Sequence, residues 1–273
     1  MAPEAHVSYP ADGVGLVLLD DPPKNFGSPA LYEKVYEGVI AVREAGSRVV
    51  VIASDVPGYF IAHYSLRQLV DTFSGGGPPP APAPASAAAT RPNLQEELER
   101  GPMISIAANN GQAWGGGSEF SWSCNLRIAA ESATYGQPEV ALGIIPGGGG
   151  TSRLARLVGM TKCMEMIVDG HPISAREALA IGAINRVVPD DQLRAEAIAW
   201  AARIARWPAF ALEACKRSML EGIDMPLLEA RSNEQRIFRE VAPTDEAIRL
   251  MSEAQAKYEA GADSYEAIGL ERE

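Results

Sequence analysis

The sequence predicts an α/β fold over its first two thirds and a helical region over its last third. Short apolar runs that suit buried strands recur as far as residue 135, and a helical apolar stripe separates the first two of them. Beyond residue 190 the apolar residues recur at helical spacing. The chain has 273 residues, 47% of them hydrophobic and 22% charged, so composition and length both suit a globular protein with a sizeable core.

The first predicted unit is a strand, a helix and a second strand. Residues 14–19 form a short apolar run that two prolines follow. Ser28 suits a helix N-cap and Pro29 the first helical position, and a helical apolar stripe follows them. Residues 49–53, VVVIA, then suit a buried strand. A unit of this size favours a parallel, right-handed crossover.

An insertion at about 74–92 interrupts this pattern. Its centre, GGGPPPAPAPASAAAT, cannot build a core, and both a tolerated surface loop and a lid over a site fit it. Further strands are expected at 103–108, 128–130 and 133–135, and the apolar pair 187–188 precedes a long helix. Helices are expected at 151–158, 162–168, 174–181, 191–206, 209–221, 226–240 and 244–260. We therefore divide the chain into a core over 1–205 and a C-terminal helical region over 206–273.

Charge and cysteine content exclude several classes of partner. The chain carries 24 Lys and Arg against 35 Asp and Glu, a net charge of −11, so we expect no nucleic-acid partner. The 3 cysteines are far apart and suit neither a disulfide framework nor a metal pair, which predicts a reducing cytoplasm. No apolar run reaches the length of a membrane span, and the first residues lack the pattern of a secretory signal. We expect no membrane partner and no metal.

Candidate chemistry gathers in two glycine-rich segments. Gly115, Gly116 and Gly117 lie between a predicted strand and a predicted helix, where backbone N–H groups can approach a ligand closely. A tight turn with close packing explains the same glycines. Neither a dinucleotide fingerprint nor a P-loop pattern is present. Glu119 and Glu139 follow in apolar surroundings, which would raise their pKa towards neutrality and suit general acid–base work. Taken singly, each also suits an ordinary turn or helix-end acid.

These segments resemble the enoyl-CoA hydratase/isomerase (crotonase) superfamily. WGGGSEF followed by YGQPEVALGIIPGGGGTSRL is similar to the family's motifs, and TKCMEMIVDGHPISAREALAIGAINRVVP continues the similarity. The match covers roughly residues 5–220. It implies a crotonase-like spiral of ββα turns, with C-terminal helices that assemble a homotrimer or a hexamer made of two trimers.

The resemblance also implies a site for an acyl-CoA thioester. The thioester oxygen would bind an oxyanion hole made by the backbone N–H groups of Tyr64 and Gly116. Glu119 and Glu139 match the two glutamates of the family's hydratases, with Glu139 expected to deliver the proton to C2. No cofactor is implied beyond the coenzyme A of the substrate. Further substrate or CoA contacts are expected from Lys24, Ala62, His63, Leu66, Arg67, Trp114, Gly115 and Pro138.

The sequence departs from the family at the first oxyanion segment. The usual Gly-Ala-Asp is replaced by His63, Tyr64 and Ser65. A backbone donor survives any side chain, whereas tyrosine takes more room and the anchoring aspartate is absent. The predicted activity is syn addition of water to a 2-enoyl-CoA. The alternatives are an isomerase or a thioester hydrolase on the same scaffold, or a CoA-binding protein without catalysis.

Overall fold

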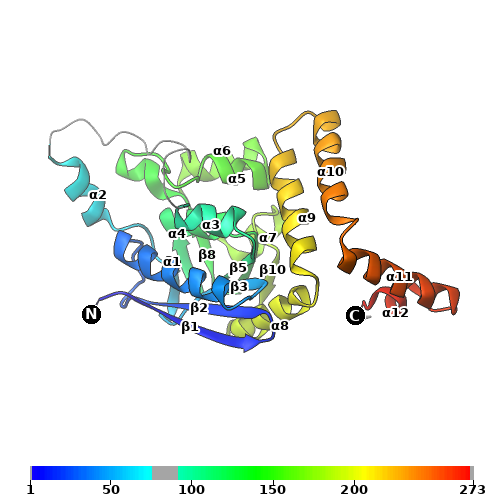
Figure 1. Ribbon diagram of the computed structural model, residues 1–273. Coiled ribbons are helices and arrows are strands. Elements are labelled where there is room, and N and C mark those ends of the chain that lie inside the picture. The colour runs from blue at the N-terminus through cyan, green and yellow to red at the C-terminus, as the bar shows by residue number, and fades with distance from the viewer. Residues whose placement is uncertain (1, 76–91, 271–273) are drawn as a thin grey trace. The chain divides into compact units, whose positions relative to one another are not determined.

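The computed structural model describes residues 2–75 and 92–270 (Figure 1). Residues 76–91 hold most of the expected insertion and lie outside the described part. Two compact units make up the chain, Met1–Ala209 and Phe210–Glu273.

Two sheets of the first unit contain the strands of the described residues. The six-stranded sheet has the order β1-β2-β3-β5-β7-β10, and the four-stranded sheet has the order β4-β6-β8-β9. The strands of the first sheet are β1 (Glu4–Ala11), β2 (Val14–Asp20), β3 (Val49–Ser54), β5 (Ile104–Asn109), β7 (Leu126–Ala130) and β10 (Arg186–Val188). Those of the second are β4 (Gly58–Ile61), β6 (Gly111–Trp114), β8 (Thr134–Gly136) and β9 (Ile173–Ser174).

Helices separate these strands and fill the C-terminal part of the chain. In the first unit they are α1 (Pro29–Glu44), α2 (Leu66–Phe73), α3 (Leu94–Arg100), α4 (Gly116–Ser123), α5 (Ser152–Val158), α6 (Met160–Asp169), α7 (Ala175–Ala180) and α8 (Leu193–Ala205). The short 3-10 helices are η1 (Pro138–Leu142) and η2 (Asp190–Gln192). Then follow α9 (Ala209–Gly222), α10 (Leu227–Val241), α11 (Asp245–Glu259) and α12 (Ser264–Ile268).

The core of the first unit is a spiral of ββα turns. Each turn gives one strand to each sheet: β3 then β4, β5 then β6, β7 then β8. Helices α2 and α3 follow the first turn, α4 follows the second and η1 the third. The strands β3, β5 and β7 pair in parallel, as do β4, β6 and β8. The predicted fold class is therefore confirmed.

The strand–helix–strand unit at the N-terminus forms as expected. The side chain of Ser28 accepts a hydrogen bond from the N–H of Leu31 at 3.1 Å, which caps α1. Helix α1 packs against β1 and β2, and α8 packs against β3 and β5. Between them lie the fully buried strand residues Val51 and Ile52. The pairing of β2 with β3 is parallel, as the crossover predicts.

Strand β1 is absent from our sequence prediction. It pairs antiparallel with β2 at the edge of the larger sheet, and most of its side chains are exposed. A strand exposed in this way needs no apolar run, so the pattern used to find strands does not mark it. None of the helices in the described part of the chain is both long and apolar enough to cross a membrane.

The second unit carries large apolar side chains on its surface. Exposed examples on α10 are Leu227, Leu228 and Phe238, and α11 exposes Ile248 and Met251. Surfaces of this kind commonly mark contacts between proteins. The trimer or hexamer implied by the sequence resemblance stays a prediction.

Candidate active site

The candidate site lies where three parallel strands end. The segment that follows β4 holds His63 and Tyr64, the one that follows β6 holds Gly115 and Gly116, and the one that follows β8 leads to Glu139. Parallel neighbours end at the same edge of a sheet, so these segments meet although they are far apart in sequence. Main-chain hydrogen bonds tie them together, from Trp114 N to Ala62 O (3.1 Å) and from Gly115 N to Gly136 O (2.8 Å).

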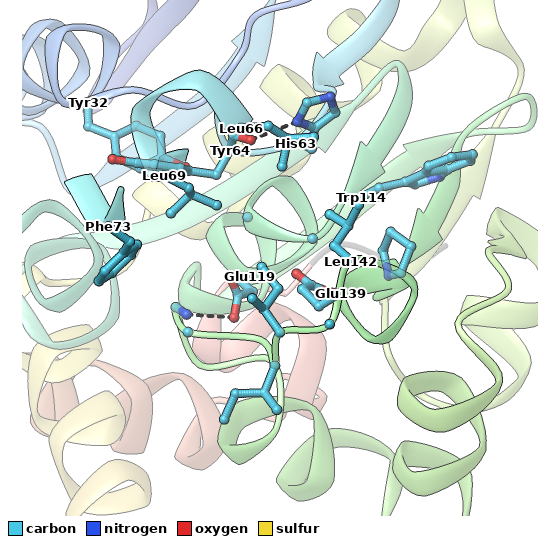
Figure 2. Close-up of a pocket in the computed structure, with 18 of the residues that line it drawn as sticks. Tyr32, His63, Tyr64, Leu66, Leu69, Phe73, Trp114, Glu119, Glu139 and Leu142 are labelled. Atoms are coloured by element: carbon cyan, nitrogen blue, oxygen red, sulfur yellow. Dashed lines mark hydrogen bonds between the residues drawn. The ribbon is translucent and has the colours of Figure 1, made fainter. Parts of the chain in front are cut away.

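A cavity of about 840 Å³ opens at this edge (Figure 2). Its wall is mostly apolar, with two carboxyl groups among the polar ones. The lining residues are Tyr32, His63, Tyr64, Leu66, Leu69, Phe73, Gln95, Trp114, Gly115, Gly116, Glu119, Pro138, Glu139, Leu142, Gly143, Ile144, Ile145, Gly147 and Gly148.

Tyr64 and Gly116, which both line this cavity, each offer a backbone N–H group as a donor. Gly27 and Tyr64 form an isolated β-bridge, in which Gly27 N donates to His63 O (2.9 Å) and Ser65 N donates to Gly27 O (2.8 Å). These two hydrogen bonds use the carbonyl group before Tyr64 and the N–H group after it, and not the N–H of Tyr64 itself. Gly116 begins α4, where an N–H has no acceptor within the helix. Among the described residues, neither the Tyr64 nor the Gly116 N–H donates a hydrogen bond to a protein acceptor.

Glycine at position 116 allows the two donors to come close together. A Cβ atom there would lie 2.9 Å from Cβ of Tyr64 and 3.2 Å from its backbone nitrogen. A larger residue would therefore push the two segments apart. The pair of N–H groups can stabilise an oxygen atom on which negative charge develops.

Glu119 lies in the first turn of α4 and is held firmly. Only 5% of it is exposed, and Oε1 accepts hydrogen bonds from Gly148 N (2.7 Å) and Gly150 N (2.8 Å). Burial raises the pKa of Glu119, while these two donors and the charge of Arg153 oppose the increase. The carboxylate form thus receives support from specific partners.

Glu139 differs from Glu119 in the charges around it. It is 8% exposed, and burial together with the charge of Glu119 raises its pKa to about 7. The buried Gln137 donates to both carboxyl oxygens at 3.2 and 2.9 Å when its amide nitrogen is turned towards them. Its pKa of about 7 leaves Glu139 partly protonated near neutral pH, whereas the two amide donors and Arg153 favour the carboxylate form of Glu119 against the effect of its burial, so the pair suits an acid beside a base.

Most of the residues predicted for the site line this cavity. They are Glu119, Glu139, Tyr64, Gly116, His63, Leu66, Trp114, Gly115 and Pro138. Three others lie outside the lining. Ala62 is fully buried, Arg67 is exposed on α2, and Lys24 lies with its Nζ 5.3 Å from the centre of the Tyr59 ring.

The departure from the family at residues 63–65 leaves the loop anchored. Ser65 accepts a hydrogen bond from Gln68 N at 3.4 Å and so caps α2. His63 Nδ1 lies 2.7 Å from the carbonyl oxygen of Tyr64. The ring of Tyr64 lies in the cavity wall, 6.1 Å from the ring of Tyr32 between centroids.

Several lining residues are missing from our sequence prediction. Tyr32 comes from α1, Leu69 and Phe73 from α2, and Gln95 from α3. They belong to helices whose sequences show only ordinary amphipathic patterns, so no motif marks them. Within residues 2–75 and 92–270, no group of three or more His, Cys, Asp or Glu side chains is placed to hold a metal ion.

Comparison with known proteins identifies a family for most of the chain. Residues 10–259 match the family described as Enoyl-CoA hydratase/isomerase. The crystal structure of an enoyl-CoA hydratase from Bacillus anthracis superposes with a TM-score of 0.80 at 30% sequence identity, over 94% of this chain and 96% of that one.

Curated relatives align with a smaller part of the chain. A protein of Rhizobium meliloti named "Probable enoyl-CoA hydratase" is 39% identical over 161 residues, which cover 59% of this chain and 62% of that protein. A 2,3-dehydroadipyl-CoA hydratase of Escherichia coli is 36% identical over 157 residues, 58% of this chain and 62% of that protein. The chain thus spans less than two thirds of the length of these relatives. The family predicted from the sequence motifs is confirmed.

Proposed function

The chain belongs to the enoyl-CoA hydratase/isomerase family, and we propose that it adds water to a 2-enoyl-CoA thioester to give a 3-hydroxyacyl-CoA. One observation carries the proposal. Glu119, Glu139, Tyr64 and Gly116 all line the same cavity. Hydration needs these groups together, because water must be activated on one side of the double bond while charge develops on the thioester oxygen.

The proposed reaction uses the difference between the two carboxyl groups. Glu119, as carboxylate, takes a proton from a water molecule, and the water oxygen forms a bond to C3. Glu139, whose pKa of about 7 leaves it partly protonated at neutral pH, gives its proton to C2 on the same face. The pair then returns to its starting state when the proton on Glu119 passes to Glu139. The addition changes no oxidation state overall, so it requires no redox cofactor.

The proposed oxyanion hole consists of backbone groups alone. As C3 is attacked, the thioester carbonyl becomes an enolate whose oxygen accepts hydrogen bonds from Tyr64 N and Gly116 N. Removing one such donor typically costs about 10²–10³ in rate. The tyrosine at position 64 leaves this chemistry available, because its N–H, and not its side chain, is the donor.

The apolar side chains in the wall of the cavity suit binding of an apolar acyl chain. Leu66, Leu69 and Phe73 of α2 line one part of it, and Leu142 and Ile145 line another. Burying apolar chain atoms against such side chains is favourable at roughly 25 cal/mol per Å². The 2-enoyl-CoA series from four carbons upwards therefore provides the substrates to test.

Loss of the enoyl absorbance of crotonyl-CoA and of longer 2-enoyl-CoAs tests the proposal directly. Wild type is expected to turn over at least one chain length, and Glu139→Gln is expected to lose about 10²-fold or more of kcat. The matched control is Glu44→Gln, which makes the same exchange at an exposed residue at the end of α1, outside the cavity lining. Absence of turnover at every chain length, with acyl-CoA still raising the thermal stability, would refute hydration and favour a binding protein.

A further inference from the structure

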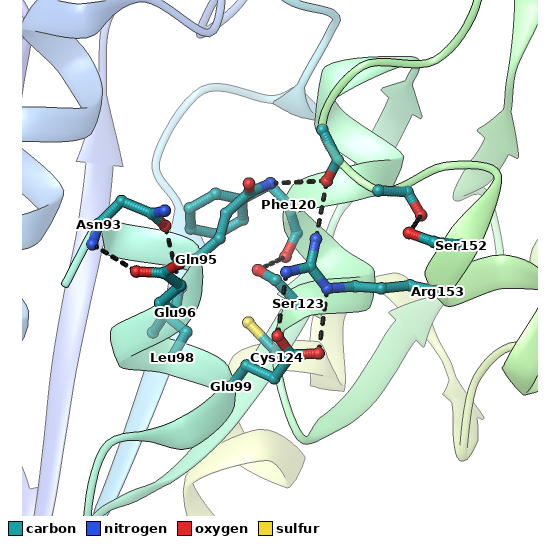
Figure 3. A network of polar contacts seen from close by, with 12 residues as sticks. Asn93, Gln95, Glu96, Leu98, Glu99, Phe120, Ser123, Cys124, Ser152 and Arg153 are labelled. Atoms are coloured by element: carbon teal, nitrogen blue, oxygen red, sulfur yellow. Dashed lines mark hydrogen bonds and ion pairs between the residues drawn. The ribbon is translucent and has the colours of Figure 1, made fainter. Parts of the chain in front are cut away.

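We propose that Glu99 and Arg153 are positioning residues for Glu119, acting through the main chain of Gly148. The proposal rests on the hydration reaction for its effect on rate, and it concerns a network behind the cavity wall (Figure 3). Neither Glu99 nor Arg153 lines the cavity.

The network begins with a two-point contact between helices. Arg153 of α5 donates from Nε to one carboxyl oxygen of Glu99 (3.1 Å) and from Nη2 to the other (3.0 Å). Glu99 lies on α3, and about a fifth of each side chain is exposed. A paired guanidinium and carboxylate have a fixed relative orientation, so α3 determines the direction of the third donor of Arg153.

That third donor holds the loop that carries the partners of Glu119. Nη1 of Arg153 donates to the carbonyl oxygen of Gly148 at 2.8 Å, and Gln95 of α3 donates to the same oxygen at 3.3 Å. The N–H of the same glycine donates to Oε1 of Glu119 at 2.7 Å. Gly148 is therefore fixed from both sides, by α3 and α5 on its carbonyl and by the carboxylate on its N–H.

The loop sequence leaves room for this contact. Gly149 has a φ of +107°, and a Cβ atom there would lie only 2.3 Å from Nη1 of Arg153. Glycine at position 149 thus lets the guanidinium reach the neighbouring carbonyl group. The glycines of the PGGGG sequence thus allow both the tight turn and the contact between Arg153 and Gly148.

The guanidinium group of Arg153 affects the pKa of Glu119, one of the two glutamates of the cavity. Burial raises the pKa of Glu119, and the charge of Arg153 opposes that increase. Burial also raises the pKa of Glu139, but there the neighbouring charge of Glu119 adds to the increase. The other titratable group that faces Glu119 is the phenol of Tyr32 on α1, whose own pKa is raised mainly by burial and further by Glu119. Arg153 therefore favours the carboxylate form of Glu119, the form that a base requires, against the effect of burial.

The experiment compares Arg153→Met with Arg156→Met. Arg156 lies on the same helix but is exposed and donates to Ser152 O, so its loss removes the same charge without touching Gly148. For Arg153→Met we expect kcat for 2-enoyl-CoA to fall about tenfold or more, the effect of losing a hydrogen bond to a charged group. The KM should change less than twofold, and the acidic limb of the pH profile should move to higher pH. Arg156→Met should match wild type.

A second measurement does not depend on turnover. ¹³C NMR of labelled glutamate in a Glu139→Gln background reports the titration of Glu119, assigned by the signal lost in Glu119→Gln. We expect Glu119 to titrate at higher pH when Arg153 is replaced by Met. If wild type hydrates nothing while this shift is present, the proposed hydration fails and the positioning role stands.

Two variants separate positioning from simple structural support. Glu99→Gln keeps the size of the side chain and should lower kcat with KM unchanged. Arg153→Lys keeps the charge without the two-point contact and should restore the Glu119 titration more than it restores kcat. An unchanged Glu119 titration in Arg153→Met, or a kcat lowered only in step with thermal stability, would overturn the proposal.

Discussion

Replacing Glu139 by Gln should stabilise the folded protein at alkaline pH while it removes activity. A carboxyl group whose pKa is raised on folding binds its proton more tightly in the folded state. The contribution of Glu139 to the free energy of unfolding therefore falls as the pH rises from the pKa of the unfolded state to the pKa of the folded state, because the carboxyl group ionises first in the unfolded chain. Glutamine does not titrate, so the difference between the two proteins isolates this contribution.

The size of the effect follows from the two pKa values. The ordinary value is 4.5 and the folded value is about 7. At pH 8 this shift costs about 3 kcal/mol of the free energy of unfolding, at 1.36 kcal/mol per pKa unit, and at pH 5 it costs less than about 1 kcal/mol. Because Glu139 faces a cavity that water can enter, we discount the change between the two pH values to about 2 kcal/mol.

Urea unfolding followed by tryptophan fluorescence measures this difference. Wild type and Glu139→Gln are compared at pH 5 and pH 8 at one protein concentration, so that any association affects both equally. The stability advantage of the variant should grow by about 2 kcal/mol from the lower to the higher pH. An advantage that stays the same at both pH values would refute the link between burial of Glu139 and its raised pKa.

Two further outcomes follow from the geometry of the site. Gly117→Ala should lower the free energy of unfolding by about 1–3 kcal/mol and abolish turnover, because the added Cβ would lie 1.9 Å from the carbonyl oxygen of Ile61. Gly75→Ala, which meets nothing within 4 Å, is the control, and equal stability of the two variants would contradict the packing argument. The hydration rate should fall as pH rises through about 7, where Glu139 loses its proton; a rate that keeps rising through this range in a kcat–pH profile would argue against Glu139 as the acid.

Local sequence patterns were sufficient wherever a structural requirement falls on neighbouring residues. Ser28 and Pro29 mark the start of α1, because a cap and its helix are adjacent in the chain. The three glycines before Glu119 are likewise a local pattern, since the close approach to Tyr64 and Ile61 excludes larger residues there. Such positions could be predicted before the fold was known.

Contacts between distant segments could not be predicted in this way. Glu99 and Arg153 are 54 residues apart, and neither helix carries a pattern that points to the other. Tyr32 resembles any other apolar position of α1 until the fold brings it beside Tyr64. The expected contacts of Lys24 and Arg67 came from similarity alone, and both residues lie outside the cavity lining.

The arrangement of β4, β6 and β8 places the groups of the proposed reaction on separate segments of the chain. Each strand ends in its own segment, so the first amide donor, the second amide donor with Glu119, and Glu139 are carried by separate turns of the spiral. A substitution after β8 can exchange the acid without disturbing the donors, and one after β4 can reshape the space around them without removing either carboxyl group. The tyrosine at position 64 is a change of this second kind. A scaffold built in this way can diversify one component of a reaction at a time while the sheet that aligns the components stays the same.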